Sequence, residues 1–297
     1  MLLKTVVQNV SRGGVKDSSG RPQDRWPLLF DRLEPEEPDL VLIQEAEDFA
    51  DDGHRLMIDV EQRLDMEGLL PRSASGLGPA VFYRRSTLGR RIFWNDDYGV
   101  QETHHGYGIA GFNIPGLPSP LGVGSAHLTP YDDDKALAEA GFVGTRTYRA
   151  GGPYCMVGMD ANYPPQAGPE PDYSEMRPYN MGSRTLLRDP AANEAPGPDR
   201  RIAWKLHANG LRDVAWELYR QSGDEELLTR TATDDRIDQL WVSAALVPAI
   251  VPGSYRLLDD PETPRYPGGP TKASDHRGLV VIIDTDLIDT QNPWSYR

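Results

Sequence analysis

The sequence predicts an α/β protein in which β-sheets pack together and are flanked by helices. Short β-like runs recur along the chain with turn signals between them, and helical periodicity occurs in fewer places. The 297 residues include 29 Gly and 26 Pro, a content typical of proteins with many turns and long loops. A chain of this length can bury a sizeable core, and we predict that residues 1–297 form one domain.

Strands are predicted where short apolar runs are bounded by turn residues. These runs are residues 2–10, 39–44, 80–83, 122–126, 154–158, 239–243 and 278–283. The run 279–283 is continuously apolar, as expected for a strand that is covered on both faces of its sheet.

Helices are predicted between some of these strands. Residues 24–33 read as a helix that ends before Pro35. Residues 132–142 begin with acidic side chains and place Ala136 and Ala140 at helical spacing. Residues 211–218 are a third candidate helix.

A long stretch, residues 163–198, is rich in Pro, Gly, Asn and Asp and directly follows the motif GMDAN. A loop of this length in a compact domain is functional or disordered. We expect either a loop on the substrate side of a site or a surface insertion with no chemical role.

The formal net charge is −14, from 45 acidic and 31 basic residues. Nucleic-acid binders usually carry a basic footprint, so this charge argues mildly against tight DNA binding without a metal, although a local basic cleft is compatible with it. Cys155 is the one cysteine, so no intramolecular disulfide forms, and its apolar neighbours predict a buried thiol. We see no signal peptide and no apolar stretch near the roughly 20 residues that span a bilayer, and expect a cytoplasmic protein.

Polar residues end two of the predicted strands. Asn9 ends the first, and Glu45 directly follows the apolar run 40–43. A carboxylate at the end of a core strand is costly unless it is solvated, paired or bound to metal. A carboxylate and an amide oxygen suit Mg²⁺ or Mn²⁺. The alternative is that both side chains make turn hydrogen bonds.

Asp160 and Asn162 follow the predicted strand 154–158. Residues two apart in an extended chain face the same way, so this pair can hold an attacking water and a phosphate oxygen side by side. The same pattern also occurs in simple turns.

Asp275 and His276 precede the most apolar strand. A histidine at the mouth of a strand can act as a general acid or base near neutral pH. Asp238 begins another strand and could fix a histidine tautomer. The alternatives are an exposed or strand-capping histidine and a surface salt bridge between Asp238 and Arg236.

Other polar residues are weaker candidates. His127 follows a predicted strand and could donate a hydrogen bond to a scissile phosphate, and His104–His105 could shape a substrate wall or have no role. The arginine pairs at 84–85, 90–91 and 200–201 could contact phosphates or form a solvated face. The sequence contains no G-x-S-x-G, Walker A, CxxC or HExxH motif.

Taken in order, these motifs resemble those of the endonuclease/exonuclease/phosphatase superfamily, which includes deoxyribonuclease I. The resemblance covers nearly the whole chain and rests on Asn9, Glu45, His127, Asp160, Asn162, Asp238 and Ser274-Asp275-His276. It implies a four-layer α/β/β/α sandwich with a site where the strand ends converge.

The resemblance also implies residue roles. Asn9, Glu45 and Asp275 would bind or support Mg²⁺, for which Mn²⁺ can substitute. Asp160 and Asn162 would position and activate the nucleophile. The remaining roles are a phosphate contact for His127 and a proton-handling or charge-stabilising role for His276, oriented by Asp238. A histidine at position 127 is typical of the deoxyribonuclease and sphingomyelinase branches rather than of the repair enzymes.

The predicted activity is a Mg²⁺-dependent phosphodiesterase that hydrolyses nucleic acid, with DNA as the leading substrate. The alternative is hydrolysis of a small phosphate ester, such as a nucleotide, sugar phosphate or phospholipid head group, which the net charge of −14 favours. A third possibility is a non-catalytic binding module that kept the fold. No protein partner is indicated.

Overall fold

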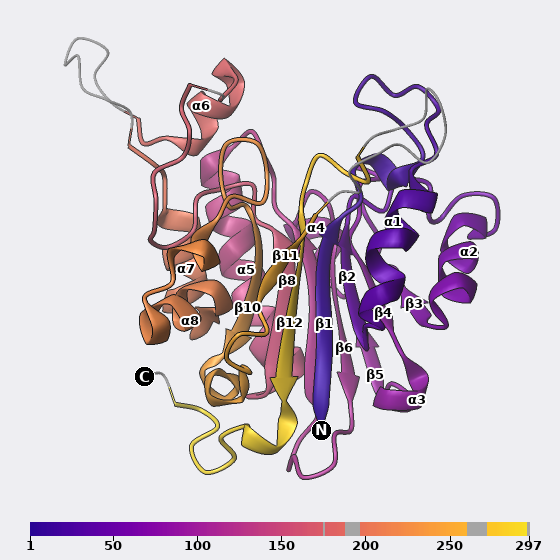
Figure 1. Cartoon of the computed structure of the whole chain (residues 1–297), viewed down its shortest axis with the longest axis vertical. Helices are drawn as coiled ribbons and strands as arrows, with labels where there is room; N and C mark the ends of the chain where they lie inside the picture. The colour runs from indigo at the N-terminus through magenta and orange to yellow at the C-terminus, as the bar shows by residue number, and fades with distance from the viewer. Residues whose placement is uncertain (175, 188–196, 260–271, 296–297) are drawn as a thin grey trace.

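The protein is represented by a computed structural model, which describes residues 1–174, 176–187, 197–259 and 272–295. Within these residues the strands form two sheets that lie face to face (Figure 1). The first sheet has the order β11 (Arg256–Leu258), β12 (Gly278–Asp284), β1 (Leu2–Asn9), β2 (Leu40–Gln44), β4 (Ala80–Tyr83), β3 (Glu67–Leu69). The second has the order β5 (Phe93–Asn95), β6 (Tyr107–Phe112), β7 (Leu121–His127), β8 (Cys155–Asp160), β10 (Asp238–Ser243), β9 (Leu211–Asp213).

Helices cover the outer face of each sheet. The first sheet packs against α1 (Trp26–Leu33) and α2 (Arg55–Leu64), and the second against α5 (Asp133–Gly151) and α7 (Arg201–Ala208). The other α-helices are α3 (Arg85–Leu88), α4 (Gly99–Glu102), α6 (Pro178–Arg184) and α8 (Val214–Ser222). Among the residues that the structure describes, the 3-10 helices are η1 (Arg12–Gly14), η2 (Glu34–Glu36), η4 (Glu225–Leu228), η5 (Ala244–Ala249) and η6 (Thr285–Leu287). The predicted four-layer α/β/β/α sandwich is confirmed.

Every predicted strand is present, but several further strands were not predicted. β3, β5, β9 and β11 have three residues each, which is too short for an alternating pattern to appear in the sequence. β6 contains two glycines. The rings of Trp94 and Phe93, on the neighbouring strand β5, occupy the space that side chains at Gly108 and Gly111 would need. Packing against these rings therefore explains why β6 contains glycines, which lower the strand propensity of its sequence.

The predicted helix at 211–218 is partly wrong. Its first three residues form β9, and α8 begins at Val214, where the side chain of Asp213 accepts a hydrogen bond from the Ala215 N–H and caps the helix. The predicted loop at 163–198 is also partly wrong because it contains α6. Pro178 occupies the first position of α6, where a missing N–H costs nothing. Residues 175 and 188–196 of this stretch lie outside the described residues.

Two parallel strand pairs determine where a site can form. β1 runs parallel to β2, and β7 runs parallel to β8. β1 runs upward in Figure 1 from the chain's N-terminus, and Asn9 at its upper end bonds to Asp160 at the end of β8, so the carboxyl ends of both parallel pairs meet at the upper edge. Polar residues that follow these strands are therefore brought to one edge of the sandwich.

The two sheets approach each other closely beneath this edge. A Cβ added to Gly158 of β8 would lie 2.7 Å from Leu42 Cδ1 and 2.7 Å from Val7 Cγ2, both on the first sheet.

Cys155, also on β8, is buried, as predicted. In the described part of the chain, no helix is both long enough and apolar enough to cross a membrane.

We expect Gly158→Ala to lower the free energy of unfolding by about 1–3 kcal/mol, because the added methyl group would force the two sheets apart. Urea denaturation followed by circular dichroism measures this change. Gly182→Ala on α6 is the matched control, since a Cβ there meets nothing within 4 Å. Equal stability of both variants would show that the sheets can separate without cost at this point.

Candidate active site

Three of the predicted site residues lie in one row across the second sheet. His127 at the end of β7 pairs in register with Asp160 at the end of β8, and Asp160 pairs with Asp238 at the start of β10. Asp160 and Asp238 are fully buried, and His127 nearly so. Because side chains alternate across a strand, this register fixes all three on neighbouring positions at the upper edge.

Asn9 connects this row to the first sheet. Its Nδ2 donates hydrogen bonds to Asp160 Oδ2 at 2.9 Å and to Glu45 Oε1 at 3.2 Å. Its Oδ1 accepts a hydrogen bond from the Ser11 N–H at 2.8 Å. The amide of Asn9 therefore orients two carboxylates from different sheets toward one point.

Two residues of the site adopt left-handed backbone conformations that non-glycine residues rarely use. Glu45 has a φ of 58° and Asn162 a φ of 57°. Glu45 Oε2 accepts a hydrogen bond from the Arg12 N–H at 2.8 Å, and the Asn162 N–H donates to Asp160 Oδ1 at 2.8 Å. These contacts compensate the backbone strain, which is commonly found at functional sites.

His276, which is partly buried, pairs with the fully buried Asp238. His276 Nδ1 lies 2.8 Å from Asp238 Oδ2, whereas Arg236 forms a buried ion pair with Asp213. The alternative pairing of Asp238 with Arg236 is therefore not what the structure contains. Burial alone would lower the pKa of His276, but the charge and hydrogen bond of Asp238 raise it well above the ordinary 6.5.

The loop that carries His276 is itself anchored. The His276 N–H donates to Ser274 Oγ at 3.2 Å, and its carbonyl accepts from Arg32 Nη1 at 3.2 Å. Arg32 also donates to Gln8 Oε1 at 2.9 Å, next to Asn9 at the end of β1. The histidine is thus held against both the helix layer and the first sheet.

Two groups of side chains within the described residues are close enough to hold a cation. Glu45, His127 and Asp160 have ligand atoms within 4.8 Å of one another, as do Asp160, Asp238 and His276. Asp160 belongs to both groups and is their centre. Asp275 lies outside both groups and is exposed, so of the predicted metal residues the structure brings Glu45 and Asn9 together with Asp160 and leaves Asp275 on the rim.

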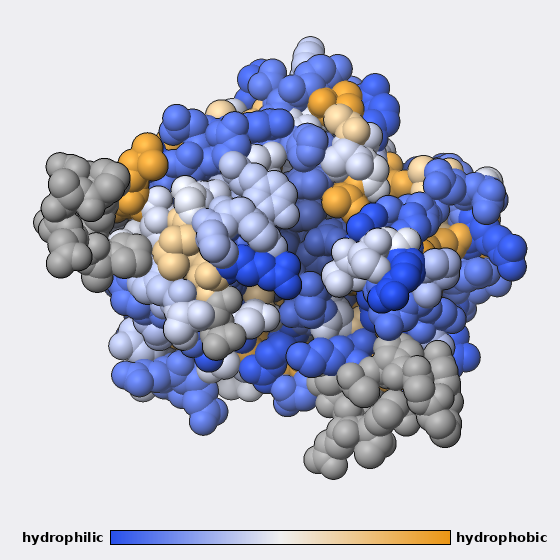
Figure 2. Space-filling model, turned by 90° about the horizontal axis from the view of Figure 1, so that it is seen from above, coloured by the Kyte–Doolittle hydropathy of each residue, from blue (hydrophilic) through white to orange (hydrophobic). Residues whose placement is uncertain are grey.

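The site opens into a cleft of about 670 Å³ that the sequence did not reveal in full. Figure 2 looks down on this edge and shows a hollow with mostly hydrophilic residues on its floor. The cleft is lined by Glu45, His127, Asn162, His105, Tyr131 and Lys135, among others.

His105 contributes more than the sequence indicated. Its ring stacks on that of His127, with centroids 3.9 Å apart and planes inclined by 10°. Ser75 Oγ lies 2.7 Å from His105 Nδ1, and burial lowers the pKa of His105. A neutral ring therefore stacks on His127 and helps to hold it in place. The doublet His104–His105 was the one signal in the sequence, and its contact with His127 is not local in the chain.

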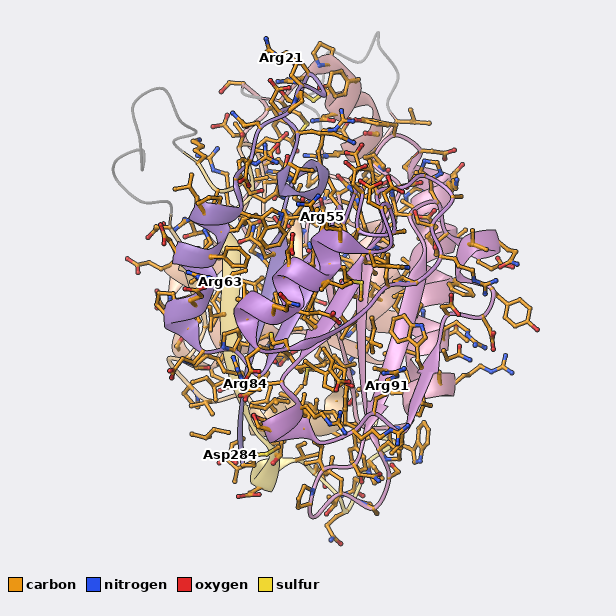
Figure 3. All side chains as sticks on the ribbon, turned by 90° about the vertical axis from the view of Figure 1, so that its right-hand side faces the viewer. Arg21, Arg55, Arg63, Arg84, Arg91 and Asp284 are labelled. Carbon is orange, nitrogen blue, oxygen red and sulfur yellow. The ribbon has the colours of Figure 1, made fainter. Side chains whose placement is uncertain are left out.

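The arginine pairs do not lie in the cleft. Figure 3 places Arg84 and Arg91 toward the end of the molecule that carries Asp284, away from the upper edge. Arg200 is buried and donates hydrogen bonds to the carbonyls of Pro165, Gly168 and Pro169. It therefore organises the stretch that follows Asn162.

We expect Asp238→Asn to lower the pKa of His276, because the substitution removes the carboxylate that keeps the imidazole protonated to higher pH. An NMR titration of the histidine ring protons in metal-free protein measures the change. Asp235→Asn is the matched control, since Asp235 is also buried and is bonded to the Arg236 N–H rather than to His276. An unchanged His276 titration in Asp238→Asn would contradict the pairing.

Solved structures of known proteins share this architecture. D. rerio TDP2 complexed with single strand DNA product superposes with a TM-score of 0.62 at 17% identity, over 96% of this chain and 99% of that chain. An endonuclease/exonuclease/phosphatase family protein from Bacteroides thetaiotaomicron gives a TM-score of 0.59 at 14% identity, over 95% and 97% of the two chains. For the human Nocturnin catalytic domain the TM-score is 0.56 at 13% identity, over 95% and 92%.

No protein-family profile matches the sequence, and no curated protein sequence matches it. The similarity is thus one of three-dimensional structure, and it extends over nearly all of each chain. The chain has the deoxyribonuclease I-like fold of the endonuclease/exonuclease/phosphatase superfamily.

Proposed function

We propose that the protein is a Mg²⁺-dependent phosphodiesterase that hydrolyses nucleic acid, with DNA as the leading substrate. The observation that carries the proposal is the convergence of Asn9 and Glu45 from one sheet with Asp160 from the other, beside an open cleft that Glu45 lines. The nucleic-acid substrate is supported by the structural similarity to D. rerio TDP2, which was solved with a single-stranded DNA product.

The donor atoms at the site fit a hard divalent cation. Glu45 offers a carboxylate that faces the cleft, and Asp160 lies beside it. Asn9 would support the ion by orienting both carboxylates through its Nδ2, and Asp275 on the rim would be a further oxygen donor. Oxygen ligands of this kind suit Mg²⁺ and Mn²⁺. When bound, the ion would polarise a phosphoryl oxygen and stabilise negative charge that develops on it.

The remaining side chains would act on the water and the phosphate. Asp160 and Asn162 would hold the attacking water, since the Asn162 backbone is already bonded to Asp160. His127 would donate a hydrogen bond to the scissile phosphate. His276, whose Nδ1 is engaged by Asp238, would use its other ring nitrogen to handle a proton or stabilise charge. Asp160 and His276 are the two candidates for the general base.

We expect Glu45→Ala and His276→Ala each to reduce Mg²⁺-dependent nicking of supercoiled plasmid by at least about 100-fold, a loss typical of removing a catalytic group. Agarose-gel assays with purified protein measure nicking, and circular dichroism checks that each variant is folded. Asp59→Ala and His54→Ala, which remove the same side-chain types at exposed positions, should retain wild-type activity.

Two results would contradict the proposal. Activity that survives both active-site substitutions would show that the site lies elsewhere. A folded wild-type protein that hydrolyses no nucleic acid with Mg²⁺ or Mn²⁺ would leave the small-ester hydrolase or the non-catalytic binding module, and phosphate release from nucleotides and phospholipid head groups would then decide between these two.

The small-ester alternative is favoured by one specific observation, the net charge of −14. Binding of a nucleic-acid strand releases counterions, so its affinity should fall by about 10-fold or more between 50 and 200 mM salt if several phosphates are contacted. Fluorescence anisotropy of a labelled oligonucleotide, measured with His276→Ala to prevent turnover, gives this slope. A salt-independent affinity would favour the small ester.

A further inference from the structure

Two exposed tyrosines, one of which lines the cleft, form an aromatic wall. Tyr131, in the loop between β7 and α5, lines the same cavity as Glu45 and His127. Tyr179 on α6 meets Tyr131 edge to face, with ring centroids 5.8 Å apart and planes inclined by 75°. The two side chains are 68% and 51% exposed. Neither ring is buried in the core, so packing of the fold does not account for them.

Ring faces remain available on this pair. An edge-to-face contact covers less of each ring than a stacked contact does. Arg177 adds a positive charge to the same wall, since its guanidinium lies 6.0 Å from the Tyr179 ring centroid and its Nη1 donates to the Tyr179 hydroxyl at 2.7 Å. The hydrogen bond to Tyr179 raises the pKa of Arg177.

The segment that carries Tyr179 is fixed to the loop that leads into β10, the strand that carries Asp238. Arg184, the last residue of α6, forms a buried ion pair with Asp234 at 2.9 Å. The Asp172 N–H donates to the Asp234 carbonyl at 2.8 Å. Figure 1 shows α6 standing above the upper edge of the sheets. The aromatic wall therefore has a defined position relative to the Asp238–His276 pair.

We infer that Tyr131, Tyr179 and Arg177 form a binding site for an unpaired nucleobase of the substrate strand and its adjacent phosphate. The inference rests on the proposed function and adds the substrate class, a single-stranded or unpaired segment. Bases inside a duplex have no free face, whereas an unpaired base can stack on an aromatic side chain whatever its sequence.

Stacking also offers a source of affinity that the charge of the protein does not oppose. A chain with a net charge of −14 repels a polyanion at long range. Contacts between uncharged bases and tyrosine rings are insensitive to that repulsion, and Arg177 supplies a local cation for one phosphate. The aromatic wall would thus allow an acidic protein to bind a nucleic-acid substrate.

The test compares cleavage of an oligothymidylate strand with cleavage of an equally long strand that lacks bases but keeps the sugar-phosphate backbone. We expect Tyr131→Ala and Tyr179→Ala each to lower kcat/KM on the strand with bases by about 10-fold, as removal of a stacking ring does elsewhere. Neither change should alter the weaker cleavage of the strand without bases. Tyr179→Phe keeps the ring and should retain most activity, and Tyr98→Ala is the control for an exposed tyrosine elsewhere.

Equal losses on both strands would overturn the inference, because the wall would then contact the backbone or only support the fold. A second readout is independent of catalysis. Quenching of 2-aminopurine in a single-stranded oligonucleotide, with EDTA present, should occur with wild-type protein and be lost in Tyr131→Ala. If wild type cleaves neither strand, the proposed function fails, yet tyrosine-dependent quenching would still support the base site and its absence would overturn it.

Discussion

The hydrogen bond between Asn9 on the first sheet and Asp160 on the second joins the two halves of the candidate site. The sheets lie close together below this bond because residue 158 is a glycine. A side chain at that position would collide with Val7 and Leu42. A second polar contact, from Gln44 Nε2 to Ser125 Oγ at 3.0 Å, ties the same region together. Each bond is buried, so breaking it would leave a desolvated polar group without a partner. The geometry of the site therefore depends on how closely the two sheets pack.

The positions of Asn9, Glu45 and Asp160 could be predicted from the sequence because each follows an apolar run that is long enough to be recognised as a buried strand. Parallel strands place such residues at one edge of a sheet, and the strand register determines which of them are neighbours. The pairing of Asp238 with His276 could be proposed only as one of two possibilities. Its partners are 38 residues apart, and Arg236 became available to Asp213 only when β9 and β10 paired.

Other features depend on contacts that no local pattern encodes. Glu45 and Asn162 adopt left-handed conformations, which sequence patterns predict reliably only for glycine. The role of His105 depends on the stacking of its ring on His127, a contact between residues that are distant in the sequence. The helix α6 was hidden because its stretch is rich in Pro and Gly, and it is held by a buried ion pair of Arg184 rather than by helix propensity. Tertiary contacts decide each of these cases.

The charge distribution suggests how an acidic protein could act on a phosphate. Asp160 shares its surroundings with Glu45 on one side and Asp238 on the other, and neighbouring buried carboxylates repel one another unless cations lie between them. A protonated His276 would supply one cation next to Asp238, and a divalent ion beside Glu45 would supply the other. A phosphate entering the cleft would then meet positive charge at its reacting end, while Arg177 and the tyrosine wall hold the part of the substrate that does not react. With such an ion bound, the acidic residues would favour substrate binding only when both cations are in place, and metal binding and substrate binding would then depend on each other.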